Sequence, residues 1–292
     1  MKLCSFSHRG STDLGLIDPN AARVWPLGSS LPGIGSDMVA LVRRFDEIKG
    51  RIKPSGEGIA LADVKLLAPI QAPLRNVLCV GKNYREHAKE FAASGADATG
   101  KLGSEIPEEP IIFTKASNTL VGPNGDVPLH ADLTTQLDYE AELAVIIGKR
   151  GSHIAKANAM SHVFGYTMAN DVTARDLQLK HRQWFLGKSL DGAMPMGPYV
   201  VTADELDGSK LDIRCWINDE LRQDANTRDL IFDIPTLIET ISLGMTLEPG
   251  DIISTGTPAG VGVGFKPPKF LKAGDVMRIE IEGLGTLINT VR

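Results

Sequence analysis

The sequence has little cysteine and no long apolar run. Its three cysteines, Cys4, Cys79 and Cys215, lie far apart and form no C-x-x-C pair, so they suggest neither a disulfide framework nor a zinc site. No apolar stretch approaches the length of a membrane span. Residues 1–13 lack the apolar segment of a secretion signal. We therefore expect a soluble, cytoplasmic protein with no membrane partner.

Several familiar motifs are also absent. A formal net charge of −5, without any basic run, argues against nucleic acid as a partner. The triplet at residues 187–189, GKS, resembles the end of a phosphate loop, but Arg182 occupies the position that requires the first glycine. The chain has no G-x-G-x-x-G in a Rossmann unit, no H-E-x-x-H and no G-x-S-x-G. The sequence therefore lacks these common nucleotide, zinc-protease and serine-hydrolase signatures.

The order of short apolar runs predicts a mostly β fold. At 292 residues and 42% hydrophobic, the chain can bury one large core, or a large one beside a small one. A helix is predicted over residues 36–50, with Ser36 as its N-cap. Proline-bearing LAPIQAPL then marks a boundary between a small N-terminal α+β domain (1–72) and a larger domain (73–292). Short β-type runs separated by Gly and Pro favour a β-rich α+β fold over a parallel α/β sheet.

The most informative segment is DYEAEL, residues 138–143. Glu140 and Glu142 stand two apart in a predicted strand and therefore share one face, which Asp138 can join. Two carboxylates held this close need a cation between them, and a divalent metal with oxygen ligands is the simplest one. An edge strand with a solvated acidic face is the alternative.

Asp171, at the end of the strand-like run FGYTMAND, is a third candidate ligand. Residues 173–176, TARD, begin two positions later and are typical of a capping box that opens a helix. Glu140, Glu142 and Asp171 would form an all-oxygen site of the kind that suits Mg²⁺ or Mn²⁺. The alternative role for Asp171 is a loop carboxylate bonded to backbone amides.

Four further side chains offer acid–base and electrostatic chemistry. His87 and Glu90 lie three apart on a predicted short helix, where the carboxylate can orient the imidazole and the pair can take a proton from water. Lys188, in the apolar segment WFLGKSL, can stabilise a developing enolate or carboxylate, and Lys115 in IIFTKAS is a weaker candidate. The alternatives are a solvated His–Glu pair and lysines that extend to the surface.

Residues 92–110 are mostly small, polar and charged, which predicts a loop after this helix. A lid over the site and an ordinary surface insertion are both open roles for it. We expect this loop and residues 260–270 to line the far end of the pocket, where substrates are distinguished.

Six motifs in order resemble the fumarylacetoacetate hydrolase family, from about residue 75 to the end of the chain. They are NYREH with Glu90, IIFTKASNTLVGP, DYEAELAVIIG, YTMANDVTARDLQ, QWFLGKSLD and GDIISTGTPAGVG. Residues 1–72 look like the small N-terminal domain of many bacterial members. The pattern is closer to the shorter members, such as acylpyruvate hydrolases, oxaloacetate decarboxylases and hydroxymuconate-type isomerases, than to the longer eukaryotic enzyme.

The resemblance implies a mixed β-sandwich roll, usually assembled as a homodimer, with a Mg²⁺ site that also accepts Mn²⁺ or Ca²⁺. It implies that the metal ligands are Glu140, Glu142 and Asp171. It further implies a group of catalytic residues and substrate ligands: a His87–Glu90 dyad, the active-site Lys188, Gln178 and Thr257. Lys115 is added as a candidate substrate ligand.

These residues predict a metal-dependent enzyme that acts on small 2-oxo or 2,4-dioxo carboxylic acids through an enolate held at the metal. Our first hypothesis is hydrolysis of a C–C bond in an acylpyruvate-like acid, because a His–Glu dyad is present to activate water. A decarboxylase or isomerase on the same class of acids is the alternative among enzymes. A non-catalytic ligand-binding relic is the alternative from another class. The sequence leaves the physiological substrate open.

Overall fold

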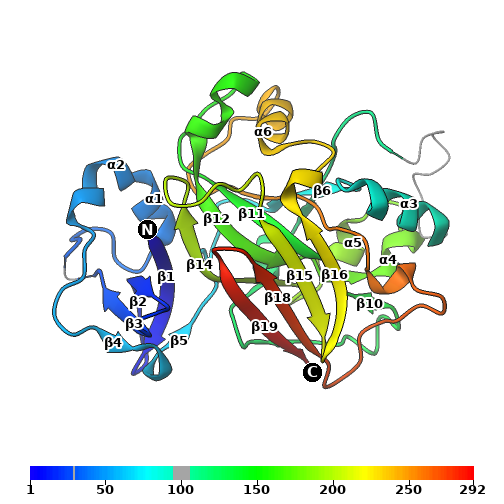
Figure 1. Ribbon diagram of the computed structural model, residues 1–292, viewed down its shortest axis with the longest axis horizontal. Coiled ribbons are helices and arrows are strands. Elements are labelled where there is room, and N and C mark those ends of the chain that lie inside the picture. Colours follow the sequence, from blue (N-terminus) through cyan, green and yellow to red (C-terminus); the bar gives the residue numbers. More distant parts are fainter. Residues whose placement is uncertain (29, 95–105) are drawn as a thin grey trace.

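The computed structural model describes residues 1–28, 30–94 and 106–292, and its largest element is a sheet of twelve strands (Figure 1). These strands are β1 (Lys2–His8), β2 (Ser11–Asp18), β3 (Arg23–Pro26), β4 (Ile59–Ala60), β5 (Lys65–Leu66), β6 (Val77–Gly81), β7 (Ile111–Lys115), β8 (Leu120–Val121), β11 (Ala141–Ile147), β12 (Val163–Asn170), β14 (Met194–Thr202) and β17 (Ile252–Ser254). Ten of them run in the order β4-β3-β2-β1-β14-β12-β11-β17-β6-β7, while β5 pairs with β1 and β8 with β14.

A second sheet packs against the first and closes the larger core. Its order is β16-β15-β18-β19-β9, formed by β9 (Asp126–Val127), β15 (Asp212–Ile217), β16 (Glu220–Asn226), β18 (Val276–Ile281) and β19 (Gly285–Val291). Buried and partly exposed residues alternate along β15 and β18, as expected for strands with one face on a core. Across the two sheets, β15 contacts β11, β18 contacts β12 and β19 contacts β14.

Strand β11 is buried along its whole length because both of its faces are covered. Leu143, Val145 and Ile147 point into the core shared with the second sheet. Ala144 and Ile146 point into another core, which the N-terminal segment covers. This arrangement explains the continuous apolar run that follows the two glutamates.

Helices occupy the margins of the sheets (Figure 1). They are α1 (Met38–Arg43), α2 (Phe45–Ile48), α3 (Arg85–Ser94), α4 (Arg175–Lys180), α5 (Phe185–Lys188) and α6 (Ile234–Ser242). The predicted helix over 36–50 is broken at Arg44, whose backbone leaves the helical region. Ser36 is not its N-cap: the Asp37 carboxylate accepts the hydrogen bond from the Val39 amide instead, at 2.8 Å.

The prediction of a β-rich fold with helices is confirmed. The division at residue 72 stays a prediction, and the large sheet crosses it: β1 pairs with β14 in the register Lys2 with Val201 and Leu3 with Val200. No helix in the described ranges is both long and apolar enough to cross a membrane.

A short two-stranded sheet lies beside the candidate site and positions two of its residues. β10 (Leu137–Asp138) pairs with β13 (Thr173–Ala174), and Asp138 lies opposite Thr173. A few residues along, β11 pairs with β12, with Ala141 opposite Asn170. The turns between these ladders therefore bring Glu140 and Asp171 together, and the Asp171 amide donates a hydrogen bond to the Glu140 carbonyl, at 2.8 Å.

Candidate active site

Three buried carboxylates converge where β11 and β12 meet. One oxygen each of Glu140, Glu142 and Asp171 lies within 4.8 Å of the others. Only 5% of Glu140 and 1% of Glu142 is exposed, which excludes the solvated edge strand. The expected single strand over 138–143 is wrong, because the chain leaves the strand at residues 139–140, between β10 and β11. The glutamates converge despite that break, and Asp138 is not part of the cluster.

Cations surround two of the three carboxylates. Lys188 Nζ lies 2.7 Å from Glu140 Oε2 and 2.7 Å from Asp171 Oδ2. Arg175 Nη1 lies 2.7 Å from Glu140 Oε1, and Lys115 Nζ lies 2.8 Å from Asp171 Oδ1. Burial alone would raise the pKa of Glu140, but Lys188 and Arg175 lower it to about 2. Glu140 is therefore an anion at neutral pH.

Glu142 has a different environment. Its Oε2 accepts hydrogen bonds from Ser254 Oγ, at 2.5 Å, and from the Gly256 amide, at 3.0 Å. Among the described residues, no cationic side chain forms an ion pair with it. Burial and the neighbouring charges of Asp171 and Glu140 raise its pKa to about 8.

The site fits a hard divalent cation. Its donors are all carboxylate oxygens, the type that Mg²⁺, Mn²⁺ and Ca²⁺ prefer. Asp171 Oδ1 is buried and receives no well-directed hydrogen bond from the described residues, although Lys115 is close. Positive charge beside Glu142 would also offset the repulsion that raises its pKa. Glu140, Glu142 and Asp171 are thus the residues that could hold the ion.

Both candidate lysines are buried, so neither extends to the surface. Burial lowers the pKa of Lys188, but Asp171 and Glu140 outweigh it and raise that pKa above its usual value. Burial lowers the pKa of Lys115. Lys188 lines the pocket, whereas Lys115 is not among the residues that line it and donates to the Val172 carbonyl, at 2.8 Å.

His87 and Glu90 lie on α3 as predicted. His87 is buried and lines the pocket, and its Nδ1 lies 3.4 Å from Glu90 Oε2. Both oxygens of Glu90 also accept hydrogen bonds from the Gly260 amide, at 3.0 and 3.1 Å. The dyad is therefore not a solvated pair, because the loop at residue 260 holds its carboxylate.

Gln178 and Thr257 also line the pocket. Gln178 lies on α4, and its Oε1 accepts a hydrogen bond from Arg175 Nη1, at 3.3 Å. Thr257 follows β17; its hydroxyl donates to the Ala141 carbonyl, at 2.9 Å, and accepts from Gln223, at 2.8 Å. These contacts fix both side chains on the pocket wall.

Arg175 is a pocket residue that the sequence analysis missed. It donates to Asp138 Oδ2 at 2.9 Å as well as to Glu140. The segment TARD was interpreted as a capping box, which is wrong: Ala174 is at the N-cap position without a side-chain bond, and Thr173 donates to the Asp171 carbonyl. Arg175 lies four positions after Asp171 in the sequence, and this proximity to a candidate metal ligand could have indicated it.

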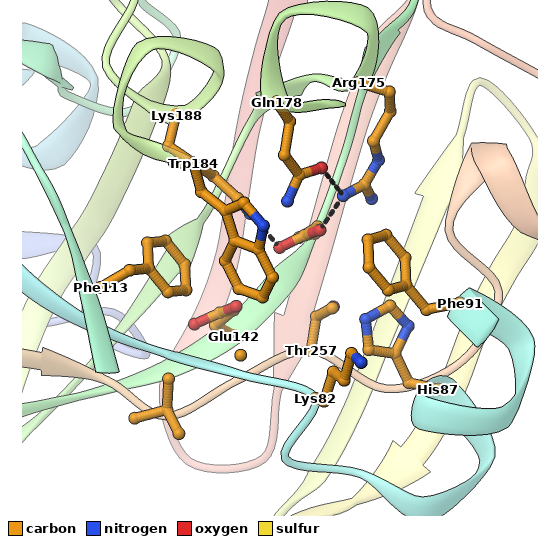
Figure 2. A pocket seen from close by; sticks show the side chains of 13 residues that line it. Lys82, His87, Phe91, Phe113, Glu142, Arg175, Gln178, Trp184, Lys188 and Thr257 are labelled. Carbon is orange, nitrogen blue, oxygen red and sulfur yellow. Dashed lines mark hydrogen bonds and ion pairs between the residues drawn. The ribbon is translucent and has the colours of Figure 1, made fainter. Parts of the chain in front are cut away.

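Lys82, Phe91 and Trp184 are further pocket residues that sequence analysis did not identify (Figure 2), as are Val80, Gly81 and Phe113. Phe91 and Trp184 meet edge to face, with ring centroids 6.4 Å apart. The two rings form an apolar part of the pocket wall. Much of the predicted loop over 92–110 lies outside the described residues, so its role as a lid stays a prediction.

Comparisons with known proteins identify the family of this chain. Residues 76–292 match the fumarylacetoacetate (FAA) hydrolase C-terminal family, and residues 1–69 match the Rv2993c-like N-terminal family. The chain is 52% identical to oxaloacetate tautomerase YisK of Bacillus subtilis over 233 residues. This match covers 80% of this chain and 74% of YisK.

Solved structures cover the whole chain. A fumarylacetoacetate hydrolase from Exiguobacterium antarcticum is 43% identical, with a TM-score of 0.86, and covers 100% of this chain and 99% of its own. Maleylpyruvate hydrolase from Sphingobium sp. SYK-6, solved with manganese(II) and pyruvate, is 31% identical, with a TM-score of 0.79, and covers 100% of this chain and 98% of its own. The chain belongs to the fumarylacetoacetate hydrolase family, whose members are enzymes.

Proposed function

We propose that this protein is a Mg²⁺-dependent hydrolase that cleaves a C–C bond in a 2,4-dioxo acid of the acylpyruvate type. The observation that carries the proposal is that His87, whose Nδ1 faces Glu90, lines the same pocket as Glu140 and Glu142 of the carboxylate cluster. A base beside an all-oxygen cation site suits the activation of water next to a polarised 2-oxo acid.

The relatives support this substrate class. A similar structure contains manganese(II) and pyruvate and is named a maleylpyruvate hydrolase. Pyruvate is the product expected when a 2,4-dioxo acid is split between C3 and C4. Mn²⁺ and Ca²⁺ also suit the carboxylate donors, so they serve as alternatives to Mg²⁺ in the proposal.

Glu140, Glu142 and Asp171 would hold the divalent cation, which when bound supplies positive charge to the 2-oxo acid end of the substrate. Lys188 is a protonated cation at this end, and its ammonium group can stabilise the enolate charge that develops. Gln178 and Thr257 orient the substrate from the pocket wall, while Lys115 positions Asp171 from behind.

The dyad performs the proton transfers. With Nδ1 turned toward Glu90, His87 uses Nε2 to take a proton from water. The resulting hydroxide bonds to C4, the C3–C4 bond breaks, and its electron pair becomes the enolate of pyruvate. A proton returned to C3 completes pyruvate, and the acyl group leaves as a carboxylic acid. Glu90 stabilises the imidazolium while it exists.

Keto–enol tautomerisation of oxaloacetate is a second candidate, favoured by the 52% identity to an oxaloacetate tautomerase. It requires removal and return of one proton and no attacking water. Decarboxylation of oxaloacetate reaches the same enolate by loss of CO₂. All three reactions use the same cation site. They differ in whether the dyad must activate water, as in hydrolysis, or only transfer a proton, as in tautomerisation.

Glu90→Gln tests the role of the dyad. We expect hydrolysis of acetylpyruvate to fall by about 10²–10⁴-fold, since general-base assistance is typically of that size, with the Mg²⁺ affinity unchanged by calorimetry. Lys89→Gln, on the exposed face of the same helix, is the matched control. Unchanged turnover in Glu90→Gln would reject the proposed role.

Product analysis separates the reactions. The wild-type protein with Mg²⁺ would be incubated with acetylpyruvate and with oxaloacetate, while pyruvate, acetate, CO₂ and the enol form are followed. Acetate with pyruvate supports hydrolysis, and a change in enol absorbance without pyruvate supports tautomerisation. No reaction with either acid, together with retained binding of oxalate, would indicate a non-catalytic binding protein. Homodimer formation and a cytoplasmic location are further parts of the proposal, and sedimentation tests the first.

A further inference from the structure

Tyr139 is a buried side chain next to a candidate metal ligand, and the reaction above does not use it. It occupies the break between β10 and β11, directly before Glu140. Its hydroxyl donates a hydrogen bond to the Gly260 carbonyl, at 2.8 Å, and accepts one from Arg222 Nη1, at 3.2 Å. The phenol therefore uses both its donor and its acceptor function, and its proton is shared with the loop at residue 260.

Gly260 lies tightly between Tyr139 and the second sheet. Its φ of +102° is in the region that favours glycine. A Cβ at this position would lie only 1.8 Å from the Arg222 carbonyl oxygen, so the loop backbone lies directly against β16. This close approach and the hydrogen bond from the Tyr139 hydroxyl together fix the position of Gly260.

The Gly260 amide in turn orients the carboxylate of the dyad. It donates to both oxygens of Glu90, at 3.0 and 3.1 Å, and Glu90 Oε2 lies 3.4 Å from His87 Nδ1. Among the residues that the structure describes, no further group bonds to the Glu90 side chain. The way in which Glu90 faces His87 therefore depends on where Gly260 lies.

Arg222 supports Tyr139 from β16. Its guanidinium carbon lies 5.9 Å from the centroid of the Tyr139 ring and 5.1 Å from that of the Phe265 ring. Its Nη2 pairs with Glu220, at 2.9 Å, and its side chain is only 10% exposed. Because the phenol is held by these contacts, its hydroxyl is a fixed donor for the Gly260 carbonyl.

We propose that Tyr139 is a positioning residue for the His87–Glu90 dyad and that it acts through Gly260. Its hydroxyl keeps the Gly260 amide where it holds Glu90 against His87. The same short segment carries Glu140, so it fixes the dyad relative to the candidate cation site. The inference rests on the proposed function, because it gives the dyad a role in turnover.

Tyr139→Phe tests the inference, because it removes the hydroxyl and keeps the buried ring. Turnover with Mg²⁺ is measured with acetylpyruvate and with oxaloacetate, for this variant alone and combined with Glu90→Gln. For the acid that the wild-type protein turns over, we expect kcat to fall about five- to tenfold, with KM and oxalate affinity within about twofold, since only the base is displaced. In the Glu90→Gln background the same change should alter kcat by less than about twofold, because the carboxylate that it positions is already absent.

Tyr166→Phe is the matched control. Tyr166 belongs to the same buried core as Tyr139, but its hydroxyl meets the backbone of Gly208 rather than that of Gly260. This variant should keep kcat within about twofold of the wild type. The inference is overturned if Tyr139→Phe leaves kcat unchanged, or if kcat falls equally with and without the Glu90 carboxylate.

Failure of the proposed function gives a different result, because the wild-type protein would then turn over neither acid. Hydrogen exchange of residues 256–264, followed by mass spectrometry, tests the link to Gly260 without any turnover. Faster exchange in Tyr139→Phe than in the wild type and in Tyr166→Phe would support the positioning of Gly260 by the hydroxyl. Equal exchange in all three proteins would overturn it.

Discussion

At the scale of single residues, the three carboxylates of the site are not equivalent. Glu140 and Asp171 are each held by two cationic side chains, whereas Glu142 is held by a hydroxyl and an amide. The pKa of Glu140 is accordingly lowered to about 2 and that of Glu142 raised to about 8. Glu142 is therefore the candidate ligand whose proton would compete with a bound metal ion near neutral pH.

This difference predicts a pH dependence of stability without metal. Because the pKa of Glu142 is raised from 4.5 to about 8, the folded state holds a proton that the unfolded state loses in this window. The free energy of unfolding should then fall as pH rises from 5 to 8, by up to about 1.4 kcal/mol per pH unit from this group.

Glu142→Gln should remove that part of the slope. Urea denaturation with a chelator at several pH values between 5 and 8 measures both proteins. Other titrating groups contribute equally to both, so the difference between the two curves reports Glu142. Parallel curves would contradict the raised pKa. Added Mg²⁺ should stabilise the wild type more at pH 8 than at pH 6, because the ion binds the deprotonated carboxylate.

At the scale of elements, α3 and the loop at residues 260–264 form one unit. Glu90 of α3 accepts from the Gly260 amide, while the Gly262 and Val263 amides donate to Asp138, at 2.6 and 3.0 Å. Asp138 in turn binds Arg175, at 2.9 Å. The loop thus connects the His87–Glu90 dyad to Arg175, which lines the pocket beside Glu140.

Gly264→Ala should disturb this unit. A Cβ at this position would lie 2.2 Å from Glu90 Oε1, so the Glu90 side chain must move from its position beside His87. We expect kcat to fall at least tenfold, because misplacement of a catalytic group by about 1 Å can cost 10²-fold, with secondary structure by circular dichroism unchanged. Gly244→Ala is the control, since a Cβ there contacts nothing within 4 Å. Equal activity of both variants would count against the coupling of α3 to this loop.

At the scale of the whole molecule, the N-terminal segment is part of the same sheet as the site. β1 pairs with β14, which pairs with β12, the strand that leads to Asp171. Residues of α1 also share a core with Ala144 and Ile146 of β11. The N-terminal segment therefore covers one face of the strand that carries Glu142.

Thermal unfolding tests this continuity. We expect one cooperative transition for the intact chain, and a deletion of residues 1–72 should lower the midpoint or cause aggregation, because it exposes the edge of β14 and an apolar face. Calorimetry of the intact chain and of the deletion measures both. Two separate transitions in the intact chain would show that the parts fold independently.

Much of the site was predictable because its chemistry lies in short motifs. DYEAEL and FGYTMAND contain the three carboxylates, and NYREH with Glu90 places the dyad on one helical face. The errors were local. Asp37 rather than Ser36 caps the first helix, because two acceptors stand side by side and spacing does not choose between them. TARD has the letters of a capping box, yet its threonine and arginine serve Asp171 and Asp138.

The sequence by itself determined the β-rich fold class, the family and the residue types of the site, because these depend on local alternation and motif spacing. Only the tertiary structure decided which charges meet. Lys188 lies 48 positions from Glu140 in the chain, yet its Nζ lies 2.7 Å from the Glu140 carboxylate. Its positive charge offsets part of the repulsion between the carboxylates, for which the sequence analysis considered only a metal ion. Arg175 and Lys82 likewise enter the pocket through packing of distant segments. The reason is physical: pKa and ion pairing depend on distance and burial, which long-range contacts set.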